Sequence, residues 1–264
     1  MTELSLAFSP CPNDTFIFHA LLRGLVGDGA HSFRPFIDDV ETLNTAAFEK
    51  RFQVTKLSAG AWLRLKNDYE LLDSGGALGF GCGPLVVAAA GKKLTPESRI
   101  AVPGLNTTAL MLFKGWNPAL KNLSEERFDR IMPGIRDGKY DGGLIIHEGR
   151  FVYKDYGCEK LADLGEWWED ETGCPVPLGC IAVRRDAGTI KHAPAIDKLI
   201  RESVEYAFAH PGKSRDFIRA NAPGMSDTVM DAHIKLYVNA FSVSMGEEGR
   251  EAFRLLEKKC AAVL

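Results

Sequence analysis

Apolar and polar residues follow each other in blocks along the chain, and one order of blocks occurs twice. Residues 4–8 form a short apolar run, and a turn with two prolines separates it from a helical pattern over 15–23. Residues 99–103 form a second apolar run, and a turn with glycine leads into a helix that opens at Thr107. Such runs, bounded by Gly or Pro, indicate buried strands. Each block therefore predicts a strand, a turn and a helix.

A second pair of blocks supports this internal repeat. A helical pattern over 40–50 precedes a strand pattern over 52–58, and a helical pattern over 125–138 precedes a strand pattern over 140–147. Both predicted strands end in polar residues. In open α/β sheets, ligands bind beyond the carboxyl ends of the strands and at helix amino termini. The pattern predicts an α/β protein of two lobes with a type II periplasmic-binding-protein-like fold and an active site in the interlobe cleft.

The expected lobes follow from the positions of these blocks. The first lobe would comprise 1–96 plus 186–264, and the second 97–185. Two hinge crossings are expected near 98–102 and 179–183, because each is a short extended run bounded by Pro or Gly.

The C-terminal part is expected to be helical and to pack on the first lobe. Residues 194–210 carry apolar positions at helical spacing and end at a His-Pro-Gly stop. Residues 226–237 and 247–264 continue the helical pattern.

Composition narrows the class of partner. The 264 residues carry 32 basic and 35 acidic side chains, so the net charge of -3 provides no electrostatic footprint for nucleic acid or an anionic membrane. No segment approaches the roughly 18 apolar residues of a membrane span. The amino terminus lacks the basic cluster and uninterrupted apolar stretch of a signal peptide. We therefore expect a cytoplasmic protein with a small-molecule partner.

The six cysteines are scattered, without a CxxC pair or neighbours at metal-ligand spacing. This pattern favours reduced cytosolic thiols and no metal site. Cys11 precedes a helix, where a thiolate can be stabilised. A buried structural role is the favoured alternative, so Cys11 is not assigned as the nucleophile.

His147 and Glu148 directly follow a strand of apolar residues. An imidazole at a strand end is suited to proton transfer. The alternative, evenly balanced on position alone, is a histidine that only caps the strand. Glu148 is a weaker candidate for orienting the ring, because adjacent side chains often point apart.

The turn that opens the helix at Thr107 can hold an anion. Thr107, Thr108 and Ala109 combine hydroxyl groups with the unpaired N–H groups of a helix start, which suits a carboxylate or phosphate. An ordinary helix cap without a ligand is the alternative.

The turn at 9–15 presents Ser9, Asn13 and Asp14 around the start of the first helix and can face the same cleft. The alternative is a capped turn without a ligand, with Asn13 or Asp14 as the helix cap. Lys56 and Ser58 offer an ammonium and a hydroxyl at the matching strand end, although a lone lysine is most often solvated.

Other conspicuous residues are given structural roles. The glycine-rich stretch 75–84 lacks a Walker Lys-Ser/Thr ending and precedes a strand, so a nucleotide loop is rejected. Residues 167–171 form a lid or, more in keeping with their two tryptophans, a packed helix. The remaining histidines are assigned to the surface or the core: His19, His31, His192, His210 and His233.

Seven segments, in this order, resemble the 1,4-dihydroxy-6-naphthoate synthase family: SPCPNDTFIFHAL, VTKLSAGAWLRL, GCGPLVV, IAVPGLNTTA, GLIIHEGR, DLGEWWE and PLGCIAVRRD. The resemblance covers nearly the whole chain. It departs at EGR after His147, where some relatives have ESR.

The resemblance implies a carbon-carbon lyase of the futalosine route to menaquinone. Such an enzyme converts cyclic dehypoxanthinyl futalosine, an anionic aromatic substrate, to 1,4-dihydroxy-6-naphthoate without an organic cofactor. His147 matches the family's proton acceptor. The segments 56–58 (Lys56, Leu57 and Ser58) and 108–109 match its substrate-binding segments, and Thr107 is included because the boundary can shift by one residue.

Two other functions remain as alternatives. Chorismate dehydratase shares the pathway and the fold, but the motifs IIHE and SPCPNDTF of this chain are not recognised as motifs of that enzyme. A solute-binding protein for a small carboxylate would share the two-lobed plan, but it would need a secretion signal or lipid anchor.

Overall fold

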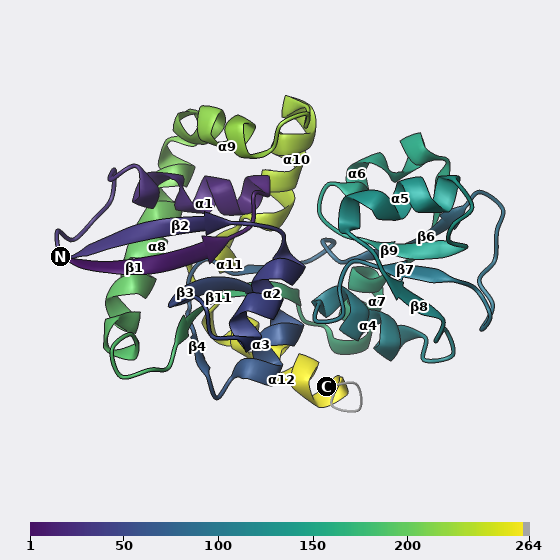
Figure 1. The fold of residues 1–264 in the computed structure, drawn as a ribbon, viewed down its shortest axis with the longest axis horizontal. Helices are drawn as coiled ribbons and strands as arrows, with labels where there is room; N and C mark the ends of the chain where they lie inside the picture. Colours follow the sequence, from purple (N-terminus) through teal and green to yellow (C-terminus); the bar gives the residue numbers. More distant parts are fainter. Residues whose placement is uncertain (261–264) are drawn as a thin grey trace.

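The computed structural model describes residues 1–260, and these form two lobes, each built on its own sheet (Figure 1). The sheet of the first lobe has the order β2-β1-β3-β11-β4, and β5 pairs with β11. Its strands are β1 (Thr2–Phe8), β2 (His31–Ile37), β3 (Val54–Ser58), β4 (Tyr69–Leu71), β5 (Ala77–Gly79) and β11 (Val176–Arg184).

The sheet of the second lobe has the order β10-β6-β9-β7-β8. Its strands are β6 (Leu85–Ala89), β7 (Ile100–Val102), β8 (Leu123–Glu125), β9 (Gly142–Ile145) and β10 (Cys158–Asp163). The mixed α/β architecture with two sheets agrees with the fold class expected from the sequence.

The helices of the first lobe come from both ends of the chain: α1 (Pro12–Leu22), α2 (Val40–Phe48), α3 (Ala59–Leu65), α8 (Ala193–Ala209), α9 (Arg215–Asn221), α10 (Asp227–Tyr237), α11 (Ala240–Val243) and α12 (Gly246–Lys259). The second lobe carries α4 (Thr108–Trp116), α5 (Phe128–Arg136), α6 (Gly149–Val152) and α7 (Leu164–Thr172). Short 3₁₀ turns lie at Tyr153–Tyr156, Ile190–His192 and Pro211–Ser214.

The predicted repeat is present in both sheets. β1 runs parallel to β3, and β7 runs parallel to β9, so the carboxyl ends of each pair lie at one edge of their sheet. The first helix starts at Pro12, three residues earlier than expected, because proline at a first helical position has no N–H to satisfy. The last helix ends at Lys259, and the expected continuation over 261–264 lies outside the described residues.

The expected lobe boundary and hinge crossings are wrong. β6 pairs with β9 and β10, so it belongs to the second sheet although it precedes residue 96. The run 98–102 contains β7, an inner strand of that sheet, and 179–183 pairs with β3 in the first sheet. The chain passes between the sheets at 80–84 and 173–175. An apolar run bounded by Pro or Gly describes a buried strand as well as a hinge, so pattern alone could not separate them.

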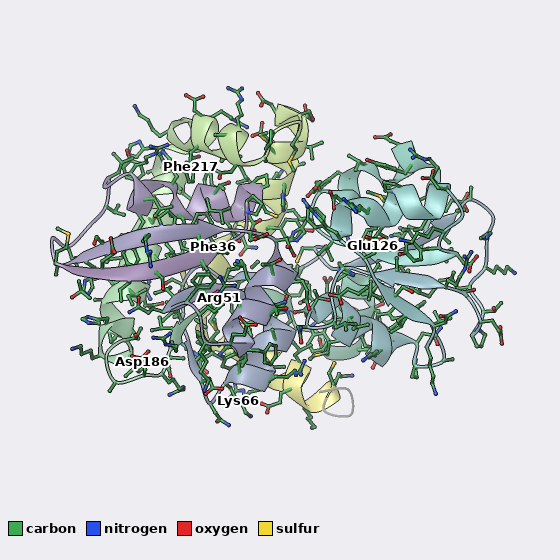
Figure 2. The ribbon with its side chains drawn as sticks, in the orientation of Figure 1. Phe36, Arg51, Lys66, Glu126, Asp186 and Phe217 are labelled. Carbon is green, nitrogen blue, oxygen red and sulfur yellow. The ribbon has the colours of Figure 1, made fainter. Side chains whose placement is uncertain are left out.

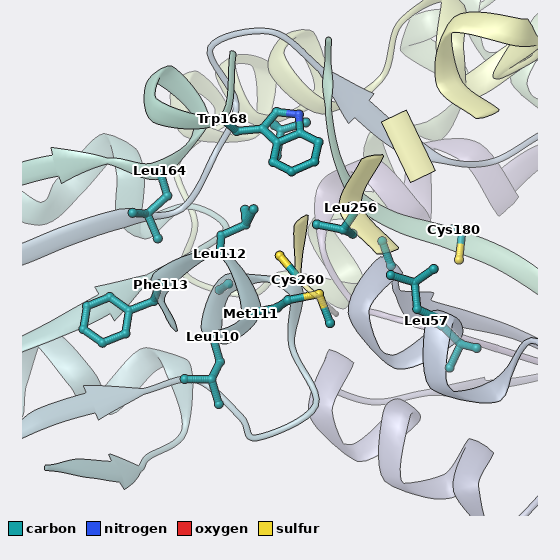
Figure 3. Close-up of a cluster of buried hydrophobic side chains, with 14 of the residues drawn as sticks. Leu57, Leu110, Met111, Leu112, Phe113, Leu164, Trp168, Cys180, Leu256 and Cys260 are labelled. Atoms are coloured by element: carbon teal, nitrogen blue, oxygen red, sulfur yellow. The ribbon is translucent and has the colours of Figure 1, made fainter. Parts of the chain in front are cut away.

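The two lobes share a continuous apolar core. Side chains of α4 and α7 in the second lobe pack in one cluster with Leu57 of β3, Cys180 of β11 and Leu256 of α12 (Figure 3). Trp168 is fully buried there, and its indole N–H donates to the carbonyl of Pro175 at 3.1 Å. The segment 167–171 is thus a packed helix.

Charged side chains cover the outer faces of both lobes (Figure 2). One example is Arg51, whose guanidinium lies 5.9 Å from the ring centre of Phe36 and covers part of that ring. No helix within residues 1–260 is long and apolar enough to span a bilayer.

Candidate active site

A cavity that is partly open to solvent lies between the lobes. Ten residues singled out in the sequence line it together: Ser9, Asn13, Asp14, Lys56, Leu57, Ser58, Thr107, Thr108, Ala109 and His147. Glu148 lies instead in a neighbouring cleft that also contains Cys11. The repeat explains this convergence, because β1, β3, α4 and β9 all direct their polar ends to the same gap.

A buried ion pair forms the first-lobe wall. The ammonium nitrogen of Lys56 lies 2.9 Å from Oδ1 of Asp14, and the two side chains are 6% and 1% exposed. Asp14 also accepts hydrogen bonds from the hydroxyl of Ser9 at 2.7 Å and from Nδ2 of Asn13 at 2.8 Å. Lys56 donates to the carbonyl of Gly75 at 3.3 Å. Lys56 is therefore neither solvated nor an isolated positive charge.

His147 follows β9 with a backbone φ of 54°, in the left-handed region that side chains other than glycine seldom occupy. The half-buried ring lines the cavity. Nδ1 lies 3.5 Å from the sulfur of Cys11, and the ring of Phe128 packs edge to face against the imidazole at 5.2 Å between centres. The ring is thus held from both lobes.

Burial lowers the pKa of His147 below its ordinary value. The nearby carboxylates of Glu148, Asp14 and Asp39 act in the opposite direction but do not overcome it. The imidazole is therefore neutral near pH 7 and can accept a proton.

Cys11 is a thiol rather than a thiolate. Burial raises its pKa well above the ordinary value, and the Glu148 and Asp14 carboxylates raise it further. A neutral thiol is a weaker nucleophile than a thiolate. Its sulfur lies beside the His147 ring.

The amino terminus of α4 forms the second-lobe wall. Thr107 caps the helix by accepting from the amide of Leu110 at 3.2 Å. The amides of Thr108 and Ala109 are the first two of the helix, so they have no acceptor within it, and they donate to no other group in residues 1–260. These two N–H groups and the helix dipole make this wall attractive to a carboxylate.

The turn before α4 is fixed by the first lobe. Glu41 of α2 accepts from the backbone amide of Asn106 at 3.0 Å and from its Nδ2 at 2.6 Å. Thr108 donates its hydroxyl to the carbonyl of Leu178 at 2.8 Å and accepts from the amide of Gly60 at 3.1 Å. The helix start is therefore positioned by contacts that cross between the lobes.

Sequence reasoning missed nine residues of the cavity, and two of them, His233 and Tyr237, are polar side chains from α10. They are four residues apart and share one face of the helix with Met230. The sequence pattern indicates only an ordinary surface or core role for His233. The signal was a histidine on the apolar face of a helix, but nothing local indicated which surface that face would meet.

No cluster of three or more His, Cys, Asp or Glu side chains within residues 1–260 is arranged to hold a metal ion. His31 and His192, whose ring nitrogens lie 2.9 Å apart, are not part of the cavity.

The two lobes and the cavity between them define a periplasmic-binding-protein-like fold. A protein from Archaeoglobus fulgidus superposes with a TM-score of 0.93 at 33% identity, covering 99% of this chain and 97% of that one. A Candida albicans protein described as having the generic periplasmic-binding-protein fold superposes with a TM-score of 0.70 at 11% identity, covering 100% and 91%.

Sequence comparison identifies the family within this fold. The family model described as "Menaquinone biosynthesis" matches residues 4–262. A 1,4-dihydroxy-6-naphthoate synthase from Thermus thermophilus is 48% identical and is aligned over 96% of this chain and 92% of its own length. One from Streptomyces coelicolor is 42% identical over 98% and 93%. The chain belongs to this family of menaquinone-biosynthesis enzymes.

Proposed function

We propose that the protein is a lyase that converts cyclic dehypoxanthinyl futalosine to 1,4-dihydroxy-6-naphthoate, with His147 as the general base. The names of its two relatives support the product. The observation that carries the proposal is that the neutral imidazole of His147 and the amino terminus of α4 line one cavity. That arrangement pairs a proton acceptor with a carboxylate-binding wall.

The proposed reaction divides the work between the amino terminus of α4 and His147. The substrate carboxylate binds the amides of Thr108 and Ala109, which places the partly saturated ring toward His147. His147 takes a proton from that ring, and the carbon-carbon bond to the sugar-derived fragment breaks as the second ring becomes aromatic. The fragment keeps the electron pair of that bond, takes up the proton from His147 and leaves. A positioned general base contributes about 10²- to 10⁴-fold to such a step.

The role of general base requires the tautomer of His147 that carries its proton on Nδ1, beside the sulfur of Cys11. If Nδ1–H points to the sulfur of Cys11, the lone pair of Nε2 is free to accept the proton. A thiol with a raised pKa keeps its own proton and does not compete for the one removed from the substrate.

The test measures naphthoate formation from cyclic dehypoxanthinyl futalosine by absorbance and mass, for the wild type and His147→Ala. His210→Ala is the control, because His210 is an exposed residue at the end of α8. We expect product from the wild type and the control, and a loss of at least about 10²-fold in kcat for His147→Ala.

Other outcomes separate the alternatives. A folded wild type that binds 1,4-dihydroxy-6-naphthoate but forms no product would favour a solute-binding role. Consumption of chorismate in place of futalosine derivatives would favour the dehydratase. An unchanged kcat in His147→Ala would remove the base assignment while leaving the lyase.

We further propose that the enzyme works in the cytoplasm on an anionic aromatic small molecule. All six cysteines are free thiols in the described residues, which is the usual state in a reducing compartment.

A further inference from the structure

His233 is a second imidazole at the cavity, brought there by the C-terminal part of the chain. α10 stands on the side of the first lobe that faces the second lobe (Figure 1), and His233 and Tyr237 on one face of it line the cavity. The ring centre of His233 lies 6.3 Å from that of His147. The two rings therefore border the same reacting space from different lobes.

The ring of His233 makes no hydrogen bond with the part of the chain that the structure describes. The residue is 1% exposed, and its Nδ1 is buried without a hydrogen-bond partner among the described residues. Its neighbours are aromatic: Tyr237 packs edge to face at 4.6 Å, and Phe151 lies at 6.5 Å. A buried polar atom without a partner lowers stability, and such atoms in native proteins call for an explanation.

Packing alone does not explain this histidine. An aromatic hydrocarbon ring would fill the same space against Tyr237 and Phe151 without an orphaned nitrogen. His19, another buried histidine, packs at 5.8 Å from the ring of Phe217 and is outside the cavity. What distinguishes His233 is its place in the cavity wall, where its ring can contact a bound molecule.

The charge state fits a role as a neutral hydrogen-bonding group. Burial, with a further contribution from His147, lowers the pKa of His233 to about 3. A neutral imidazole presents one N–H donor and one acceptor nitrogen. It can polarise an oxygen without transferring its own proton, as neutral histidines do in some isomerases.

We propose that His233 is a further catalytic residue, whose ring N–H binds the substrate oxygen that becomes negative as His147 removes a proton. This proposal rests on the lyase function above. The proton goes to His147, and the electron pair moves toward the oxygen held by His233. As that pair returns to the ring, the carbon-carbon bond breaks, its own electron pair stays on the leaving fragment, and the fragment takes up the proton that His147 holds. His233 keeps its proton throughout.

The test compares His233→Phe, His233→Asn and His233→Gln with the wild type in the futalosine assay, alongside thermal unfolding. Phe keeps the aromatic packing and removes the nitrogens, whereas Asn and Gln place an amide near Nδ1 and Nε2, respectively. His19→Phe is the matched control for a buried histidine outside the cavity.

We expect His233→Phe to lower kcat by about 10²- to 10³-fold, as for the loss of one oxyanion donor, with KM within about threefold of the wild type. Its Tm should equal or exceed that of the wild type, because the orphaned nitrogen is gone. At least one amide variant should recover about tenfold or more of the lost kcat. His19→Phe should keep the wild-type kcat.

Three results would overturn the proposal while leaving the lyase function intact: a kcat of His233→Phe within threefold of the wild type, a defect confined to KM, or amide variants as slow as Phe. If His233→Phe does not fold, the test rests on His233→Asn and His233→Gln. The proposal is then supported if both amide variants have a lower kcat than the wild type while His19→Phe keeps the wild-type kcat. A folded wild type without turnover would instead overturn the function on which it rests.

Discussion

Replacing Lys56 by Met removes the cation of the buried ion pair while keeping most of the aliphatic side chain. The Asp14 carboxylate, 1% exposed, would stay in place with its hydrogen bonds from Ser9 and Asn13 but without a counter-charge. Removing one partner of a buried pair typically costs 3–5 kcal/mol. Because Asp14 keeps these hydrogen bonds, we expect the lower end, about 3 kcal/mol in the free energy of unfolding.

The measurement is urea unfolding of Lys56→Met, Asp14→Asn and the double variant. The double variant should be more stable than Lys56→Met, since no uncompensated charge remains, and the double-mutant cycle should show clear coupling between the two sites. Lys50→Met is the control, because Lys50 pairs with Asp68 at 2.7 Å on the surface, where both side chains are well exposed. A loss below about 1 kcal/mol in Lys56→Met, or strictly additive effects, would refute the reasoning.

Two further predictions concern pH and packing. As pH falls from 6.5 to 5, His233 gains a proton in the unfolded chain but not in the folded protein, where its pKa is about 3. The free energy of unfolding should therefore fall by about 2 kcal/mol over this range because of His233. In His233→Phe the free energy of unfolding should decline less steeply with falling pH, and equal slopes would contradict the prediction. Gly83→Ala should destabilise the protein by several kcal/mol, because a Cβ there would overlap the backbone of Gly165. Gly212→Ala, which meets nothing within 4 Å, should be nearly neutral by the same urea assay.

Much of the candidate site was predictable because its signals are local. The repeated strand, turn and helix pattern placed Ser9, Thr107 and His147 at strand or helix ends, and those ends converge in the structure. A capping threonine and a histidine after an apolar strand are visible in a few consecutive residues.

The electrostatic partners were not predictable in the same way. Lys56 and Asp14 are far apart in sequence, and only the parallel pairing of β1 with β3 brings their side chains together. Glu148 illustrates the opposite case. It is adjacent to His147, yet the turn directs it into the neighbouring cleft.

The sequence by itself determined the local elements, their caps and the polar strand ends, because periodicity and turn chemistry depend on neighbouring residues. The tertiary structure alone decided that β6 joins the second sheet and that α10 brings His233 to the cavity. Strand exchange between sheets and the docking of a distant helix depend on long-range pairing and burial. An apolar face shows that a helix will be covered, but only the assembled fold decides what covers it.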